Sequence, residues 1–213
     1  MKSYSAVIFD MDGVIVDSEP RHEQAFLDIF DQLGYTDNHG IHFPNYIGRS
    51  DRAVWLDFMA AHRPHHSIEE LTMLKQKRFL EILQEDQPIF DGLPDLVAKL
   101  APKYPLAVAS GSLHPVIDEV LALKSLRRFF PVVVSIQDVA KGKPAPDVFL
   151  RAAKLLKVEP KECVVIEDSV AGVEAGLAAG MTVIGITNSF PAEKLSNAHH
   201  VVKTYEEIER LLL

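Results

Sequence analysis

The sequence predicts an α/β protein: a Rossmann-like parallel sheet core with an all-helical segment inserted after the first strand. Short apolar runs recur along the chain with amphipathic patterns between them, as expected for strands joined by crossover helices. The runs lack the alternation of a half-exposed strand, which is typical of parallel strands buried on both faces. A stretch without a strong strand candidate, from about residue 19 to residue 88, interrupts this rhythm.

The strand candidates are five clear runs and a weaker sixth one. They are short apolar runs without clean alternation, and most of them contain several Val or Ile residues. The runs are residues 5–10, 105–109, 132–135, 163–167 and 182–186, with 198–202 as a last edge strand. Between them, amphipathic patterns that start at Pro115 and Pro146 predict helices, and we expect a helix to open at Ser110 as well.

The interrupting stretch is predicted to form a separate helical domain. Three helical patterns lie within it, at residues 22–34, 51–62 and 68–85. We therefore predict a discontinuous core domain of residues 1–17 and 89–213, and a helical cap domain of residues 18–88.

Composition excludes several classes of function. The net charge is −8, from 22 basic and 30 acidic residues, which argues against binding a nucleic-acid backbone. The only cysteine, Cys163, rules out an internal disulfide and is expected to be a buried strand residue. No apolar stretch approaches the roughly 18 residues that a membrane helix needs. We expect a cytoplasmic protein without a membrane or nucleic-acid partner, and a monomer.

Reactive side chains follow the predicted strands where each strand ends. In an open α/β sheet, ligands bind at the carboxyl ends of the strands, so these residues are expected to meet. They are Asp10 and Asp12 after the first strand, Ser110, Gly111 and Ser112 after the second, Lys143 in the loop KGKPAPD, and Glu167 and Asp168 after the fourth.

This set of groups suits phosphate chemistry with a hard cation. Mg²⁺ binds one or two carboxylates together with phosphate oxygens. Helix N-terminal amides and a lysine ammonium can hold a phosphate. The i, i+2 spacing of Asp10 and Asp12 puts both on one side of an extended segment. One can then be a nucleophile and the other a proton donor, provided that their environments differ.

Four motifs in this order resemble those of the haloacid dehalogenase superfamily. They are Asp10-Met-Asp12-Gly-Val, Ser110-Gly-Ser, Lys143-Pro-Ala-Pro-Asp and Glu167-Asp-Ser. The resemblance runs over the whole chain, and the helical segment is similar to the mobile cap of that family. The chain looks most like the subgroup of β-phosphoglucomutase-like sugar-phosphate phosphatases.

The resemblance implies a role for each motif residue. Asp10 would attack phosphorus and form an aspartyl-phosphate, while Asp12 would act as acid and then as base. Ser110 and Lys143 would hold the phosphoryl oxygens, and the backbone amides of Met11 and Gly111 would help them.

The resemblance also implies a magnesium site. Mg²⁺ would bind the Asp10 carboxylate, the Asp12 carbonyl and Asp168, with Glu167 in or near the coordination shell. The Lys143–Pro144 peptide bond is expected to be cis, as it can be in this family.

Substrate contacts in the cap are expected at five positions. His22 lies where the mutases carry a histidine that couples cap closure to proton transfer. Lys75 falls near a position that contacts a second phosphate in the mutases, and a surface role is its alternative. The specificity loop would be Gly48, Arg49 and Ser50. Ile47 stands where the mutases have a lysine, which weakens the case for mutase activity.

Alternative functions remain open at this point. The first hypothesis is a Mg²⁺-dependent phosphatase of a small phosphomonoester, such as a sugar phosphate. A β-phosphoglucomutase shares the nucleophile and the metal, whereas a haloacid dehalogenase lacks a counterpart of Asp12. A phospho-acceptor signalling domain is much shorter than this chain, and a non-catalytic phosphate-binding regulator is a further alternative. No nucleotide-binding fingerprint is present.

Overall fold

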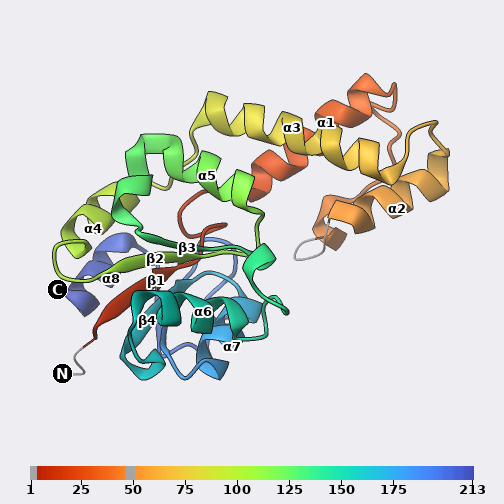
Figure 1. The fold of residues 1–213 in the computed structure, drawn as a ribbon. Coiled ribbons are helices and arrows are strands. Elements are labelled where there is room, and N and C mark those ends of the chain that lie inside the picture. Colours follow the sequence, from red (N-terminus) through yellow and green to blue (C-terminus); the bar gives the residue numbers. More distant parts are fainter. Residues whose placement is uncertain (1–3, 47–50) are drawn as a thin grey trace. The chain divides into compact units, whose positions relative to one another are not determined.

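The computed structural model describes residues 4–46 and 51–213 of the chain (Figure 1). The chain separates into two compact units. One combines Met1–Asp17 with Pro88–Leu213 and carries the sheet; we call it the core unit. The other, Ser18–Gln87, is built from helices, and we call it the helical unit.

The core unit contains a six-stranded parallel sheet in the order β3-β2-β1-β4-β5-β6. All six predicted strands are confirmed, with ends that shift by a few residues at most, and the last one lies at an edge as expected. The most buried strands occupy the centre, where both faces are covered. The strands are β1 Ala6–Phe9, β2 Leu106–Ala109, β3 Val132–Val134, β4 Cys163–Glu167, β5 Thr182–Ile186 and β6 His200–Val202.

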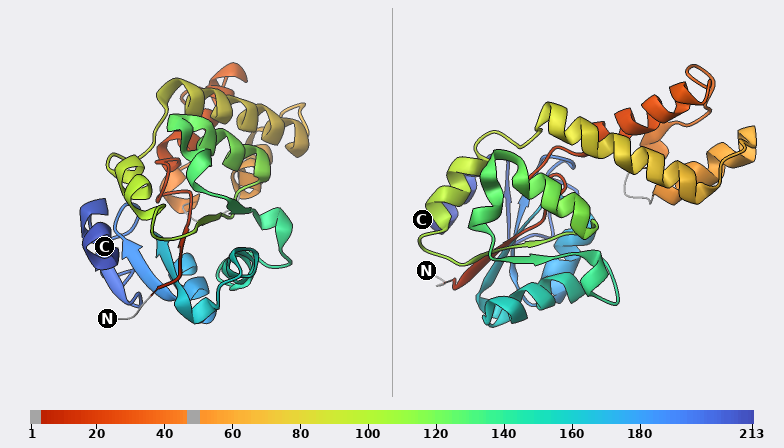
Figure 2. Two further views of the ribbon diagram at one scale, coloured as in Figure 1. Left: turned by 60° about the vertical axis from the view of Figure 1, so that its left-hand side comes forward. Right: turned by 45° about the horizontal axis from the view of Figure 1, so that its top comes forward.

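Helices cover both faces of this sheet, which explains why its central strands are apolar throughout (Figures 1 and 2). On one face, α6 (Asp147–Leu156) and α7 (Val170–Ala178) pack against alternate residues of β1, β2, β4 and β5. On the other face lie α4 (Leu93–Leu100), α5 (His114–Ala122) and α8 (Tyr205–Leu212). Short 3₁₀ turns η2 Leu123–Phe129, η3 Ile136–Asp138 and η4 Pro160–Glu162 complete the unit.

Helix α5 differs from the prediction at both ends. No helix opens at Ser110: α5 begins only at His114, with Pro115 in its first turn, where a missing N–H costs nothing. It ends at Ala122, although the apolar pattern continues to residue 126, because Lys124 and Ser125 have φ values of 49° and 56°. Residues in the left-handed region cannot continue a right-handed helix.

The helical unit comprises α1 (Glu19–Gln32), η1 (Phe43–Tyr46), α2 (Asp51–His62) and α3 (Ile68–Asp86). A capping box starts α3, because the Ser67 side chain accepts from Glu70 N–H and the Glu70 carboxylate accepts from Ser67 N–H. An aromatic cluster fills its interior, and its largest members are Phe26, Phe30, Trp55 and Phe58. None of the described helices combines the length and apolar character needed to cross a membrane.

Candidate active site

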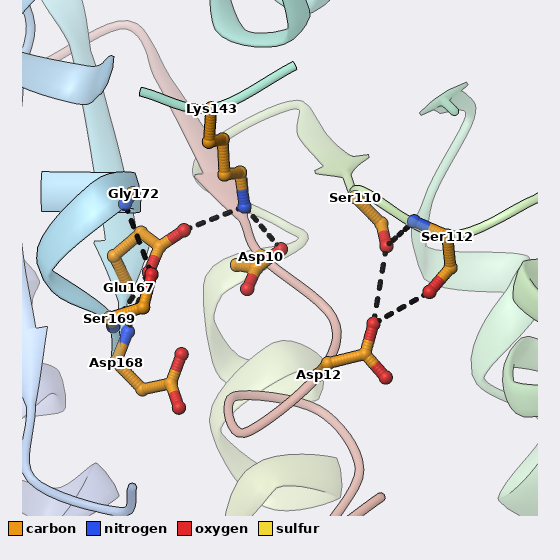
Figure 3. Close-up of polar contacts among 9 residues, drawn as sticks. All are labelled: Asp10, Asp12, Ser110, Ser112, Lys143, Glu167, Asp168, Ser169 and Gly172. Atoms are coloured by element: carbon orange, nitrogen blue, oxygen red, sulfur yellow. Dashed lines mark hydrogen bonds and ion pairs between the residues drawn. The ribbon is translucent and has the colours of Figure 1, made fainter. Parts of the chain in front are cut away.

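Four segments of the core unit converge at the carboxyl edge of the sheet (Figure 3). Asp10 follows the last residue of β1, Ser110 follows the last residue of β2, and Glu167 ends β4. Because β1 lies between β2 and β4, these three positions are neighbours. The loop between β3 and α6 adds Lys143, whose peptide bond to Pro144 is cis, as expected.

The first group of side chains is Asp10, Lys143, Glu167 and Asp168, which we call the acid–lysine cluster. Lys143 Nζ donates to Asp10 Oδ1 at 2.5 Å and to Glu167 Oε1 at 2.6 Å. One carboxylate oxygen from each of the three acids lies within 4.8 Å of the others. All three acids are buried, and the Lys143 side chain is only 12% exposed.

Glu167 is held firmly by the start of α7. Its Oε2 accepts hydrogen bonds from the backbone N–H of Asp168 and of Ser169 and from the Ser169 hydroxyl, each at 2.9 Å. The Ser169 hydroxyl in turn caps α7 by accepting from Gly172 N–H at 3.0 Å. The carboxylate is therefore fixed in direction by the same residues that begin the helix.

Burial sets the protonation behaviour of the acid–lysine cluster. It raises the pKa of Asp10 well above the usual range, and the charges of Glu167 and Asp168 add to this although Lys143 opposes it. It also raises the pKa of Asp168 to about 7, with a further contribution from the Glu167 charge. Burial alone would lower the pKa of Lys143, but Asp10 and Glu167 together raise it. The raised pKa values of Asp10 and Asp168 mean that the three acids resist being ionised together while Lys143 is the cation beside them.

The acid–lysine cluster fits a divalent cation by charge and by donor type. Three carboxylates and one ammonium leave a net charge of −2 when all are ionised. Hard cations such as Mg²⁺ prefer oxygen ligands, and every acidic donor here is a carboxylate oxygen. Asp10 and Asp168 are the side chains that would hold such an ion, with Glu167 beside them.

The second group is Asp12, Ser110 and Ser112, which we call the Asp12 cluster. Ser112 Oγ donates to Asp12 Oδ2 at 2.8 Å, and Ser110 Oγ makes a longer contact of 3.5 Å with the same oxygen. The Asp12 carboxylate therefore points toward the turn after β2, whereas the Asp10 carboxylate lies beside Lys143 (Figure 3). Two aspartates that are two residues apart thus occupy different electrostatic environments.

Two glycines allow the site acids to approach the backbone closely. A Cβ at Gly13 would lie 1.8 Å from Asp168 Oδ2, and one at Gly172 would lie 1.7 Å from Glu167 Oε1. Gly13 also has a φ of +75°, which disfavours any other residue. The observed positions of the Asp168 and Glu167 carboxylates therefore require glycine at residues 13 and 172.

Gly13→Ala is expected to weaken divalent-cation binding strongly, because the new methyl group would push Asp168 away from Asp10. The matched control is Gly180→Ala, since Gly180 has a φ of +74° but nothing within 4 Å of an added Cβ. Backbone strain should cost each variant about 1–2 kcal/mol of stability in urea unfolding, and Gly13→Ala should lose more because its methyl group also clashes with Asp168. Only Gly13→Ala should also lose Mg²⁺ affinity, measured by calorimetry. Equal losses of Mg²⁺ affinity in both variants would contradict this role of Gly13.

Without a metal ion, the free energy of unfolding is expected to fall as the pH rises toward 7. Asp168 has a pKa of about 7 in the folded protein, against 3.8 as the reference for the unfolded chain. The folded state therefore binds more protons between these values, so the stabilisation is complete below 3.8 and is lost as the pH rises through 7. Asp10 shifts in the same direction, and the raised pKa of Lys143 acts only above 10.5.

Urea unfolding in EDTA at about pH 5 and about pH 8 measures this effect, because the linkage relation converts proton uptake into a slope of stability against pH. Asp168→Asn should reduce the slope, since the amide does not titrate. Asp95→Asn, at an exposed position on α4, serves as the control. The same slope in Asp168→Asn and in wild type would exclude Asp168 as the cause.

The other predicted phosphate-binding groups lie next to these clusters. Met11 is buried, and its carbonyl accepts from the N–H groups of Val14, Ile15 and Val16, which forms the turn after β1. Gly111 is exposed, and nothing lies within 4 Å of a Cβ added there. The roles assigned to their amides stay predictions.

Two of the predicted cap residues, His22 and Lys75, are in contact with each other in the structure. In the helical unit, Lys75 Nζ lies 2.5 Å from His22 Nδ1 and 2.8 Å from Asp51 Oδ2. The His22 ring stacks on Phe79, with ring centroids 3.8 Å apart. Lys75 is only 1% exposed, so the alternative of a surface role was wrong.

Contact of either His22 or Lys75 with a substrate stays a prediction. Ile47 and the predicted specificity loop, Gly48, Arg49 and Ser50, lie outside the described residues.

Sequence reasoning missed a set of residues after β5. Asn188 Nδ2 donates to Gly13 O at 2.8 Å and to Tyr205 Oη at 3.1 Å, and Tyr205 Oη donates to Val14 O at 2.6 Å. The Ser189 side chain hydrogen-bonds to Asp168. These contacts support the turn that follows Asp12. The rule that site residues follow strand ends would have found Asn188 and Ser189 if it had been applied to β5.

Comparison with known proteins identifies the family. Residues 4–180 match the haloacid dehalogenase-like hydrolases. The chain belongs to this family. This haloacid dehalogenase-like hydrolase is 34% identical over 197 residues to hexitol phosphatase B of Escherichia coli K12, covering 90% of this chain and 86% of that protein. It is 32% identical over 190 residues to fructose-1-phosphate phosphatase YqaB of the same organism, covering 86% of this chain and 96% of that one.

A solved structure supports the same assignment for this haloacid dehalogenase-like hydrolase. A Thermotoga maritima protein assigned provisionally as a β-phosphoglucomutase superposes with a TM-score of 0.83 at 29% identity, covering 98% of each chain. The expected resemblance to β-phosphoglucomutase-like proteins and sugar-phosphate phosphatases is therefore confirmed, and so is the predicted fold class.

Proposed function

We propose that this hydrolase cleaves a small phosphomonoester, a sugar phosphate in the first place, with Mg²⁺ as its cofactor. The observation that carries the proposal is the separation of two aspartates into different clusters. Asp10 lies against Lys143 and two further acids, while Asp12 is turned toward two serine hydroxyls. Groups in such different environments can divide the roles of nucleophile and acid–base catalyst.

The first half of the proposed reaction transfers the phosphoryl group to Asp10. A carboxylate oxygen of Asp10 attacks phosphorus, the ester P–O bond breaks, and protonated Asp12 gives its proton to the leaving alcohol oxygen. The product is an aspartyl-phosphate. Lys143 and the Ser110 hydroxyl would hold phosphoryl oxygens. In support of this, Lys143 Nζ contacts Asp10 Oδ1, and Ser110 Oγ lies 3.5 Å from Asp12 Oδ2.

The second half hydrolyses this acyl phosphate. Water attacks phosphorus and gives a proton to Asp12, the bond from phosphorus to Asp10 breaks, and inorganic phosphate leaves. Asp10 is again a carboxylate and Asp12 is again protonated, so the net change is ester plus water to alcohol plus phosphate. Mg²⁺ held by Asp10 and Asp168 would supply positive charge against the phosphoryl oxygens.

The names of the relatives support the substrate class. Two of them are phosphatases of a ketose phosphate and of hexitol phosphates, and a third, 31% identical over 189 residues, is a phosphorylated carbohydrates phosphatase from Thermotoga maritima. A polyol or sugar phosphate is therefore the first class of substrate to test.

Phosphate release from a panel of phosphomonoesters, with Mg²⁺ and with EDTA, tests the proposal. The panel contains hexose, pentose and hexitol phosphates, phosphoglycolate and nucleoside monophosphates, with Asp10→Asn as the blank. Release that needs Mg²⁺ and is absent from the blank supports the proposal. Absence of release from every ester would contradict it, and isomerisation of β-glucose 1-phosphate would then test a mutase.

Asp12→Ala is expected to lower kcat/KM for a sugar phosphate by roughly 10²–10⁴-fold, the usual contribution of a positioned acid–base group. Mg²⁺ affinity should change little, because the Asp12 side chain lies in the other cluster. Calorimetric Mg²⁺ titration and steady-state kinetics measure the two effects. A wild-type rate in this variant would rule out Asp12 as the acid.

A further inference from the structure

We propose that Ser112 is a positioning residue: its hydroxyl fixes the direction of the Asp12 carboxylate for proton transfer. This inference rests on the proposed function and deepens it. It assigns a role to the last residue of the Ser110-Gly111-Ser112 turn, to which the motif analysis gave no role of its own.

The contact geometry favours Ser112 over Ser110 as the partner of Asp12. Ser112 Oγ lies 2.8 Å from Asp12 Oδ2, a normal distance for a hydroxyl that donates to a carboxylate, whereas the contact from Ser110 Oγ is 3.5 Å. The Ser112 hydroxyl is also directed at Asp12 and away from the acid–lysine cluster (Figure 3). In this arrangement the Ser112 hydroxyl donates to Asp12, while the Lys143 ammonium donates to Asp10.

Ser112 is itself held in place by two hydrogen bonds. Its N–H donates to Ser110 Oγ at 2.9 Å, and its carbonyl accepts from Ser135 Oγ at 2.7 Å. Ser135 is fully buried, and its own N–H donates to Asp138 Oδ2 at 2.8 Å. The hydroxyl that contacts Asp12 is therefore anchored through Ser135 to the segment between β3 and η3, which is a different part of the chain from the Asp12 loop.

Asp12 needs such a partner because of its position in the chain. It lies beyond the end of β1 on a half-buried turn, where a carboxylate can rotate about two side-chain bonds. A proton donor has to stay within hydrogen-bond reach of the leaving oxygen, so a fixed direction raises the rate of proton transfer. The hydrogen bond from the anchored Ser112 hydroxyl contributes to that direction.

The test compares kcat/KM for two esters that differ in their need for an acid. Cleavage of an alkyl phosphate such as a hexitol phosphate would release an alkoxide, which is a poor leaving group and needs a proton from Asp12. Cleavage of 4-nitrophenyl phosphate releases 4-nitrophenolate, which is stable and needs no proton. The parameter kcat is not used, because water attack in the second half also requires Asp12. The variants are Ser112→Ala, Ser112→Thr and Ser196→Ala, with Asp12→Ala as the reference.

Ser112→Ala is expected to lose roughly 10-fold in kcat/KM for the alkyl ester, with little change for 4-nitrophenyl phosphate. Asp12→Ala should show the same pattern with larger losses. Ser112→Thr keeps the hydroxyl and should recover most of the alkyl activity. Ser196→Ala removes an exposed hydroxyl that donates to Glu193 O, and should match wild type on both esters.

Other results would overturn the inference. Equal losses on the two esters would make Ser112 a phosphate-binding or structural residue, and no loss on either ester would show that the hydrogen bond is unimportant. Both outcomes leave the proposed function intact, because wild type still hydrolyses the esters. If neither wild type nor Ser196→Ala hydrolyses any ester, the proposed function and the inference fail together. Thermal melting of Ser112→Ala shows whether a loss follows from unfolding.

Discussion

Asp10→Asn is expected to lower phosphate release by roughly 10⁴-fold or more, the scale on which loss of a covalent nucleophile acts in other enzymes. An amide oxygen cannot attack phosphorus as a carboxylate does, so the first half of the reaction stops. The fold should survive, because the amide keeps the shape of the side chain and removes one of the three acids crowded around Lys143. The melting temperature should be at least that of wild type.

Initial rates with a hexitol phosphate and thermal melting measure these effects together. Asp118→Asn is the matched control, since it makes the same chemical change at an exposed position on α5. Rapid quenching followed by peptide mass spectrometry provides a second readout: a phosphorylated peptide that contains Asp10 should appear in wild type only. Substantial turnover by purified Asp10→Asn, or phosphate on another residue, would show that Asp10 is not the nucleophile.

Lys143→Met is expected to lose both activity and stability. Lys143 Nζ contacts Asp10 and Glu167 at 2.5 Å and 2.6 Å, and burial raises the pKa of Asp10 even with this ammonium beside it. Removing one partner of a buried ion pair costs about 3–5 kcal/mol, because the other charge is left uncompensated. Under the proposed mechanism, the reaction would also lose the cation that holds a phosphoryl oxygen.

Denaturant unfolding in EDTA and in excess Mg²⁺ measures the stability loss. Mg²⁺ should recover part of it, since a divalent cation neutralises the same carboxylates. Lys141→Met provides the control, because Lys141 is exposed and lies in the same loop two residues earlier. If Lys143→Met is as stable as Lys141→Met in EDTA, the buried ion pair does not stabilise the fold.

The ends of helix α5 could not be predicted, because they depend on the conformation of individual residues. The apolar pattern of residues 115–126 continues through Lys124 and Ser125, yet both adopt positive φ and α5 ends before them. Periodicity reports which face of a segment is apolar, and it does not report the backbone conformation of individual polar residues. The start of α5 was misjudged for a similar reason, because Ser110 resembles an N-cap but uses its hydroxyl within a turn.

The sequence by itself determined the succession of strands and helices along the chain and the burial of the central strands. It also determined which acidic residues lie at the carboxyl edge of the sheet. Those features follow from local composition: runs such as residues 163–167 are too apolar for any position except a covered sheet, and ligand-binding residues follow strand ends. Asp10, Lys143, Glu167 and Asp168 could therefore be named from their places after predicted strands.

Only the tertiary structure decided how the site residues are divided between the acid–lysine cluster and the Asp12 cluster. The close approach of Asp168 to Gly13, the hydrogen bond from Ser112 to Asp12 and the ion pairs of Lys143 join positions that are far apart in the chain. Each depends on distances between strand ends and on side-chain direction, which are set by packing across the sheet and not by any local pattern.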